Sequence, residues 1–205
     1  TRSFYYTTSE VKRNTIANVA VNWNLVNVFR NSYVPDLIYL NDLDKINPDQ
    51  YKVVVFNNTF MMDEGQKEFI KNKLASKGRT LVWFYAPAFT NGKQVDEKFI
   101  SDITGISIEK NLQEETEISF GKNHSFNILR PPYEQIYGIL PRYVYCENNP
   151  VVSPLFFVND TNAVVLGRYK KSGKPAVASK TQPSHTSIYA ALPSYEPQLM
   201  EALLQ

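Results

Sequence analysis

The sequence of 205 residues holds a single cysteine, and several patterns that reveal a chemistry are missing from it. One thiol, Cys146, excludes an intramolecular disulfide and a cysteine-based zinc site. The 8 glycines are scattered, and none forms a G-x-G-x-x-G phosphate-binding loop. No apolar run approaches the roughly 18 residues of a membrane-spanning helix. We therefore predict no metal site, no cofactor and no membrane span.

The sequence also lacks an excess of charge of either sign. With 22 Lys and Arg against 20 Asp and Glu, the net charge is +2, which is too small to indicate a nucleic-acid partner. The densest basic group lies at residues 168–174, around Ser172-Gly173. We interpret it as a solvated hairpin tip, with an anion site as the open alternative. What remains is a composition with 43% hydrophobic residues, typical of a globular protein with a core.

The clearest structural signal lies at residues 51–89, which predict a strand, a helix and a second strand. The apolar, β-branched run 52–56 is typical of a parallel strand buried on both faces. Asp63 followed by Gln66 three residues later is a capping-box pattern and predicts the start of the helix. The run 80–85 predicts a second buried strand, which Pro87 ends.

The predicted helix of this unit has one apolar stripe and a lysine-rich surface. Phe69, Ile70 and Leu74 form the stripe, and lysines 67, 71 and 73 are predicted to lie on the remaining surface. Gly78 stands where a left-handed residue is wanted after the helix.

The rest of the chain continues the alternation of helices and strands. Further helices are predicted at 11–29, 95–104 and 197–204, with Gly105 ending the second of them. Further strands are predicted at 37–40, 106–108, 117–120, 143–146, 155–158, 163–169, 175–179 and 186–190, and residues 3–6 are either a short strand or an extended lead-in. This order indicates one α/β domain over residues 1–205, with a doubly wound sheet and β-hairpins in the C-terminal half. Residues 111–152 form a long, polar and proline-rich excursion.

Ligands of open α/β sheets bind beyond the carboxyl ends of the parallel strands, and polar residues stand at these positions here. The candidate ligand-binding residues are Asp42, Asn57, Asn58, Tyr85 and His185. Asp42 follows the strand expected at 37–40, although Asp in such a place also serves turn geometry. His185 precedes a strand, and a surface or capping role is the alternative for it.

No catalytic residue can be assigned from the sequence. A nucleophile of this architecture needs a tight turn after a strand, but residues 85–88 read Tyr-Ala-Pro-Ala, without Ser or Cys. Ser187 stands two residues after His185, where a glutaminase triad has its acid. A Cys146–His185 dyad stays open, although a small buried thiol is favoured. Glu114, Glu115 and Glu117 are interpreted as solvated loop residues.

Several phrases together resemble a known family. They are LIYLNDL at 37–43, YKVVVFNN at 51–58, GRTLVWFYAP at 78–87, ITG at 103–105 and SIYAALP at 187–193. The set resembles the glutamine-amidotransferase-like domain that follows the catalytic barrel in bacterial β-galactosidase-type proteins, often called the trimerisation domain. The resemblance implies a flavodoxin-like, mostly parallel sheet flanked by helices that has lost the glutaminase nucleophile. None of its phrases carries a catalytic residue.

The resemblance implies a non-catalytic structural or oligomerisation module of a bacterial carbohydrate-active protein. Its partners would be other domains or subunits, including copies of itself. The alternatives are a hydrolase or a sugar-binding domain with an unrecognised site at the strand ends. Because the sequence begins at Thr1, we interpret it as a mature or excised piece, in which the family's first strand is either absent or supplied by sequence before Thr1. The compartment stays open, and an exported, periplasmic location is one option.

The excursion also supplies candidates for subunit contact. Residues 126–152 carry many aromatic and aliphatic side chains without clean periodicity. A long irregular segment cannot bury all of them within itself. We give equal weight to contact with another subunit and to packing on the segment's own domain.

Overall fold

The computed structural model describes residues 35–113, 115, 117–120, 124–127, 154–191 and 193, with backbone pairing alone for 124–127. Within these residues the chain has an α/β fold. The elements expected at 3–6, 11–29, 143–146 and 197–204 lie outside the described residues.

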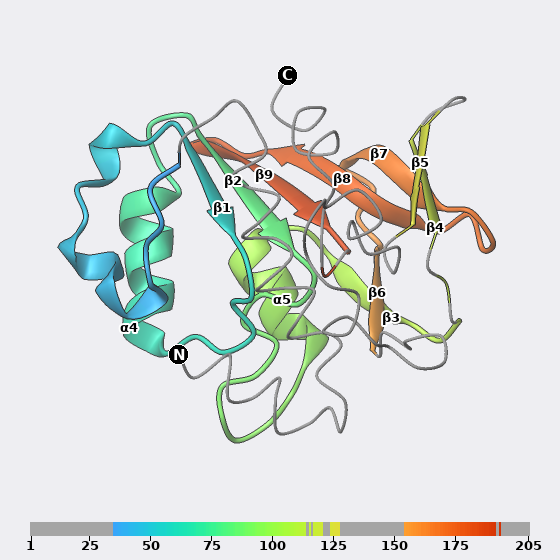
Figure 1. Cartoon of the computed structure of the whole chain (residues 1–205), viewed down its shortest axis with the longest axis horizontal. Coiled ribbons are helices and arrows are strands. Elements are labelled where there is room, and N and C mark those ends of the chain that lie inside the picture. The colour runs from blue at the N-terminus through green and yellow to red at the C-terminus, as the bar shows by residue number, and fades with distance from the viewer. Residues whose placement is uncertain are drawn as a thin grey trace, which may run out of the picture.

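The described residues form one mixed sheet of seven strands in the order β1-β2-β9-β8-β7-β4-β5 (Figure 1). The strands are β1 (Val53–Phe56), β2 (Arg79–Phe84), β4 (Glu117–Phe120), β5 (His124–Asn127), β7 (Val164–Tyr169), β8 (Pro175–Thr181) and β9 (His185–Ala190). β1, β2 and β9 are parallel to one another, and the other neighbours are antiparallel. The hairpins predicted for the C-terminal half are confirmed by the β7-β8 and β8-β9 pairs.

A second, two-stranded sheet consists of β3 (Ile108–Asn111) and β6 (Leu155–Val158), which pair antiparallel. The strand expected at 106–108 therefore begins at Ile108 and does not continue the main sheet. The Tyr169 hydroxyl donates to the Phe156 carbonyl at 2.8 Å and so joins the two sheets.

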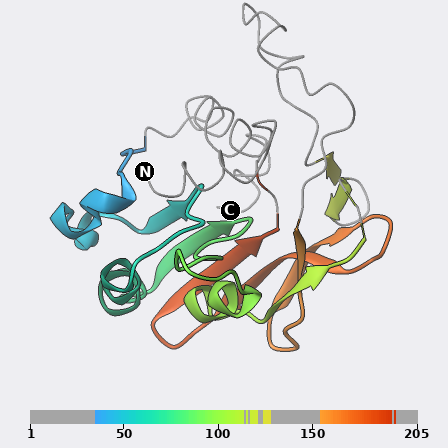
Figure 2. The same cartoon turned by 90° about the horizontal axis from the view of Figure 1, so that it is seen from below.

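The helix expected after β1 begins where its capping box predicts. The Asp63 carboxylate accepts from the Gln66 amide at 2.9 Å, and the Gln66 side chain accepts from the Asp63 amide at 3.0 Å. α4 (Glu64–Phe69) then widens into the π-helical turn η4 (Ile70–Leu74). α5 (Glu97–Thr104) begins at Asp96 and ends at Gly105 with φ +70°, as predicted. Figure 2 shows α4 and α5 against one face of the parallel strands.

Two expectations for this helix need correction. Lys67 was expected on the surface, but only 8% of it is exposed. Its ammonium pairs with Glu64 at 2.9 Å and lies 5.3 Å from the centre of the Phe99 ring, so the aliphatic stem is buried between helices. Gly78 has the predicted positive φ of +71°, but it follows Lys77 (φ +57°) in the turn before β2 and not the last helical residue.

The prediction of a strand at 37–40 is wrong. Residues 35–39 belong to no helix or strand, and the 3-10 helix η2 (Leu40–Lys45) follows, then η3 (Pro48–Gln50). The exposed fractions of Leu37 and Tyr39 are 56% and 68%. An apolar run indicates a strand only when a neighbouring strand pairs with it, and no described strand does so here.

The core is centred on β2. Leu81, Val82 and Trp83 have no exposed surface, and Phe56 stacks on Trp83 with ring centres 4.0 Å apart. The burial predicted for residues 80–85 is therefore confirmed for residues 81–85, while Thr80 is half-buried. β1 differs, because it is the edge strand of the described sheet and Val53 is 38% exposed.

Candidate functional site

The loops at the carboxyl ends of β1 and β2 each hold a residue with a left-handed backbone. Asn58, after β1, has φ +50°, and Tyr85, after β2, has φ +64°. Residues with a Cβ rarely adopt this left-handed region, and such strain gathers at functional sites. The two loops are tied together, because the Ala88 amide donates to the Thr59 carbonyl at 2.7 Å.

Tyr85 is fixed on every side. Its amide donates to the Ala190 carbonyl at 2.8 Å, and its hydroxyl donates to the Pro154 carbonyl at 2.7 Å. Its own carbonyl accepts from the Tyr189 hydroxyl. Burial holds the pKa of Tyr189 well above the ordinary value of 10, so that phenol keeps the proton it donates.

The position of Tyr85 has a chemical meaning. A strained residue directly after a parallel strand is where nucleophile-elbow enzymes present their nucleophile. Here the residue is Tyr85, whose phenol ring points into the core. Its ring centre lies 5.5 Å from that of Phe60 and 5.7 Å from that of Phe156, both in edge-to-face contact. The turn therefore presents no nucleophile to a substrate.

The loop after β1 has three polar oxygens that are buried and unpaired. Asn57 Oδ1, Asn58 Oδ1 and Thr59 Oγ1 find no hydrogen-bond partner in the part of the chain that the structure describes. Thr59 as a whole is 7% exposed. The sequence interpretation did not select Thr59; its place directly after two selected asparagines was the available signal.

His185 lies at the other end of the sheet. It pairs with Arg79 at the start of β2, five residues before Phe84. At 3.3 Å per residue this places it about 16 Å from the strand end that precedes Tyr85. Burial lowers its pKa below the ordinary value of 6.5, and Ser184 Oγ lies 3.3 Å from its Nδ1. His185 therefore does not join the loops after β1 and β2.

Asp42 is not at a strand end either, because the strand before it is absent. It lies in the first turn of η2, and its carboxylate pairs with Lys45. Of the five predicted site residues, the structure thus gathers Asn57, Asn58 and Tyr85 at one end of the sheet.

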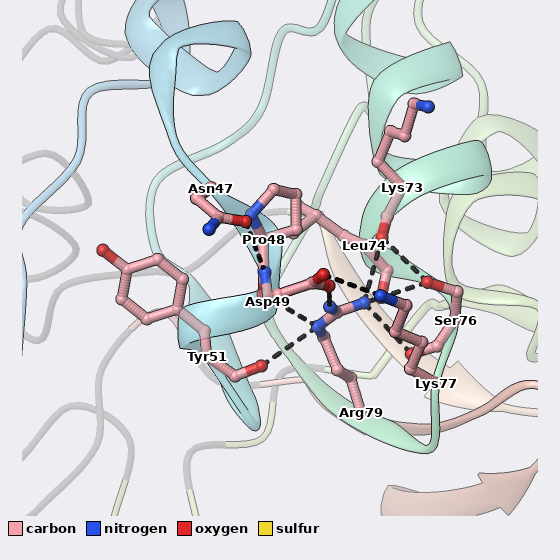
Figure 3. Close-up of polar contacts among 9 residues, drawn as sticks. All are labelled: Asn47, Pro48, Asp49, Tyr51, Lys73, Leu74, Ser76, Lys77 and Arg79. Carbon is pink, nitrogen blue, oxygen red and sulfur yellow. Dashed lines mark hydrogen bonds and ion pairs between the residues drawn. The ribbon is translucent and has the colours of Figure 1, made fainter.

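The amino-terminal end of the parallel strands is closed by Arg79 (Figure 3). Its guanidinium is 4% exposed and pairs with Asp49 at 2.7 Å. It also donates to the carbonyls of Pro48, Tyr51, Lys73, Leu74 and Ser76 at 3.0–3.4 Å, and to Ser76 Oγ at 2.9 Å. All three guanidinium nitrogens donate hydrogen bonds, so the side chain of Arg79 has a structural role here. We call Arg79 and its hydrogen-bond partners the clasp. The carbonyls of Lys73 and Leu74 lie at the end of η4 and also accept from Ser76, through its Oγ at 2.9 Å and its amide at 2.8 Å, so the Arg79 side chain adds a second donor to each.

The basic hairpin tip between β7 and β8 already holds an anion, and it comes from the same chain. Glu115, expected in solvent, is 4% exposed. Its carboxylate accepts from the Ser172 amide at 2.8 Å and from the Asn111 side chain at 3.1 Å. Glu117 pairs with Lys170 as a solvated residue would. Glu114 lies outside the described residues.

Stability is expected to fall with acid at Glu115. Burial would raise its pKa, but the hydrogen bonds from Ser172 and Asn111 outweigh it and hold the pKa below the ordinary value of 4.5. The stabilisation is therefore complete above that value and is lost as the pH falls through the lowered pKa. Replacing Glu115 with alanine should cost about 1–3 kcal/mol near neutral pH, because two donors lose their acceptor. Urea unfolding from pH 7 downward checks this, and an unchanged pH profile in the variant contradicts it.

Two further features were sought within the described residues. None of these residues forms a group of three or more His, Cys, Asp or Glu that could hold a metal ion. In the same part of the chain, no helix is both long and apolar enough to cross a membrane.

Comparison with solved structures shows which folds this chain is similar to. It is similar to the β-galactosidase from Bacillus circulans sp. alkalophilus, with 17% identity and a TM-score of 0.51 over 76% of this chain and 22% of that one. It is also similar to Gan42B, a GH42 β-galactosidase from G. stearothermophilus, with 14% identity and a TM-score of 0.58. This likeness covers 97% of this chain and 26% of Gan42B. The chain thus spans about a quarter of these enzymes. No family model and no curated protein sequence matches it.

Proposed function

We propose that the chain is a non-catalytic module of a larger, β-galactosidase-like carbohydrate-active protein. The observation that carries the proposal is Tyr85, a buried phenol at the strained turn where a catalytic domain of this architecture would hold its nucleophile. The fold likeness to about a quarter of two β-galactosidase chains supports a place beside further domains.

The finer assignment within the proposal is a flavodoxin-like, glutamine-amidotransferase-like domain of the trimerisation type. Three neighbouring parallel strands with α4 between β1 and β2 support it. The long antiparallel extension through β8, β7 and β4 is an addition to such a core. We also propose a bacterial source, as the resemblance implies.

Partner contact is supported by apolar surface that the domain leaves uncovered. Leu37, Ile38 and Tyr39 are consecutive, belong to no helix or strand, and are 39–68% exposed. Contiguous exposed apolar residues of this kind are typical of interaction surfaces. Residues 126–152, the other proposed contact segment, lie outside the described residues except for the backbone of 126 and 127. The partner is another domain of the same protein or a second copy of this chain.

The hydrolase alternative needs a nucleophile and a base within hydrogen-bond reach. Tyr85 and His185 stand at opposite ends of the parallel strands, and residues 85–88 of the turn include no Ser, Thr or Cys, while the Tyr85 hydroxyl donates to the Pro154 carbonyl. The purified chain is therefore expected to leave aryl glycosides, aryl esters and glutamine unhydrolysed. Turnover that a single substitution abolishes would overturn the proposal.

The contact role is tested by sedimentation equilibrium. The chain is expected to associate as its concentration rises, and Tyr39→Ser should weaken this association because it removes the most exposed of the three side chains. Leu112→Ser is the matched control, since Leu112 is 93% exposed but stands apart from this stretch. A strictly monomeric chain that also fails to bind the rest of its protein would contradict the contact role.

A further inference from the structure

We propose that Asn91 is a site of spontaneous deamidation in the folded chain, through attack by the Gly92 amide nitrogen, at a rate limited by one hydrogen bond to Thr90. The proposal goes beyond the module function and does not depend on it. Asn91-Gly92 is the one Asn-Gly pair in the sequence. Both residues are exposed, in the segment between β2 and α5, so water and hydroxide ions reach them.

Gly92 suits the attack because its nitrogen is little hindered. The residue after an asparagine must bring its backbone nitrogen to the side-chain carbon Cγ, and a side chain on that residue obstructs the approach. The fold also favours glycine here, since φ of Gly92 is +88°, a conformation that costs most other residues free energy. The reactive pair is therefore built into the turn.

The hydrogen bonds of the Asn91 side chain favour the reaction. Its Oδ1 accepts from the amides of Lys93 and Gln94 at 2.9 Å and 3.0 Å. When the nitrogen adds to Cγ, negative charge develops on this same oxygen. Two backbone donors at roughly 2.7–3.1 Å from such an oxygen have the geometry of an oxyanion hole. The turn thus polarises the side-chain carbonyl and stabilises the charge that the addition creates.

One hydrogen bond opposes the reaction. The Gly92 amide donates to Thr90 Oγ1 at 3.0 Å, and the Thr90 hydroxyl donates to the Gln94 carbonyl at 2.9 Å. Thr90 is 3% exposed, and its backbone forms bridges with Met61 and Val95, which hold this acceptor in place. The amide must leave Thr90 before it can lose its proton, so the opening of this contact limits the rate.

The reaction needs only water and hydroxide. Hydroxide removes the Gly92 amide proton, the nitrogen forms a bond to Asn91 Cγ, and an electron pair of the carbonyl moves to Oδ1. The adduct then collapses: the Cγ–Nδ2 bond breaks, and Nδ2 takes a proton from water and leaves as ammonia. Water opens the resulting cyclic imide at either carbonyl, which gives aspartate or isoaspartate at position 91. No group is oxidised or reduced.

Peptide mapping by mass spectrometry tests the proposal on the purified folded chain, kept for several weeks at physiological temperature and pH. Asn91 is expected to show the mass gain of replacing NH₂ with OH, in two products that chromatography separates, and faster at higher pH. Asn159 is the internal control, because it is also exposed but precedes Asp160, and it should stay unmodified. Asn91→Gln should abolish the conversion, since glutamine needs a six-membered ring. An unmodified Asn91 in the folded chain would overturn the proposal.

Thr90→Val tests the limiting contact, because valine keeps the side-chain shape but accepts no hydrogen bond. Conversion of Asn91 should speed up by about 2- to 10-fold, the factor by which loss of one hydrogen bond shifts an opening equilibrium. Thr161→Val, at an exposed threonine in the turn after β6, should leave the rate unchanged. Hydrogen exchange of the Gly92 amide gives a second readout and should accelerate with the deamidation. A rate in Thr90→Val equal to or below that of the unmodified chain, or exchange that does not follow it, contradicts the proposed limit.

Discussion

Replacing Arg79 with alanine is expected to lower the free energy of unfolding by roughly 3 kcal/mol, because a buried charged side chain loses several hydrogen bonds, and one hydrogen bond to a charged group contributes about 1.5–3 kcal/mol. The guanidinium is 4% exposed and links η3, the lead-in to β1, the end of η4 and the start of β2. Its loss removes the side-chain donor of the Tyr51 carbonyl and one of two donors of the carbonyls of Lys73, Leu74 and Ser76. A domain is stable by only about 5–15 kcal/mol, so the effect should be evident in urea unfolding followed by tryptophan fluorescence.

Two variants separate the fork geometry from the charge. Arg79→Lys keeps the charge but cannot reach so many acceptors from one planar group, so it should lose most of the same stability. Lys77→Ala removes a solvent-exposed partner of the same Asp49 carboxylate and should change stability by less than about 1 kcal/mol. An Arg79→Ala loss no larger than the Lys77→Ala loss would show that the clasp is dispensable.

Leu81→Ala is expected to cost about 2–5 kcal/mol, because truncating a fully buried leucine leaves a cavity. Leu81 has no exposed surface and lies in β2, between Val54 of β1 and Ser187 of β9 in the sheet. Neighbours on both strands hold the backbone in place, so the site has little freedom to collapse. Denaturant unfolding measures the loss directly.

Val53→Ala provides the matched control for Leu81. Val53 also lies in the parallel ladder, but it is 38% exposed on the edge strand β1. Its truncation should cost roughly 0.5 kcal/mol or less. A Leu81→Ala loss well under about 1 kcal/mol would mean that β2 is not the centre of the core.

Local signals in the sequence predicted much of the fold. The Asp63–Gln66 box, the αL residue Gly105 and the run of residues 80–85 each act over a few neighbouring residues, and the structure confirms all three. β4 and β6 were predicted with their observed bounds for the same reason. Such elements are determined by periodicity and capping, which one segment carries by itself.

Features that depend on distant partners were not predictable in this way. Nothing near Glu115 in the sequence indicates that Ser172, 57 residues away, would bury its carboxylate. Arg79 meets Asp49 across 30 residues, and the parallel register that carries His185 away from Tyr85 joins segments more than 100 residues apart. The candidate site was half predictable: strand-end logic selected Asn57, Asn58 and Tyr85, but burial alone distinguishes Thr59.

The buried phenol of Tyr85 also determines what a substitution at the turn after β2 would cost. A single change from Tyr85 to a serine or cysteine would vacate the space between Phe60 and Phe156 and leave the Pro154 carbonyl without its donor. Losses of buried aromatic rings cost about 3–5 kcal/mol, and His185 would still stand at the wrong end of the sheet. Introducing a nucleophile at position 85 would therefore cost stability and would still leave it without His185 within reach.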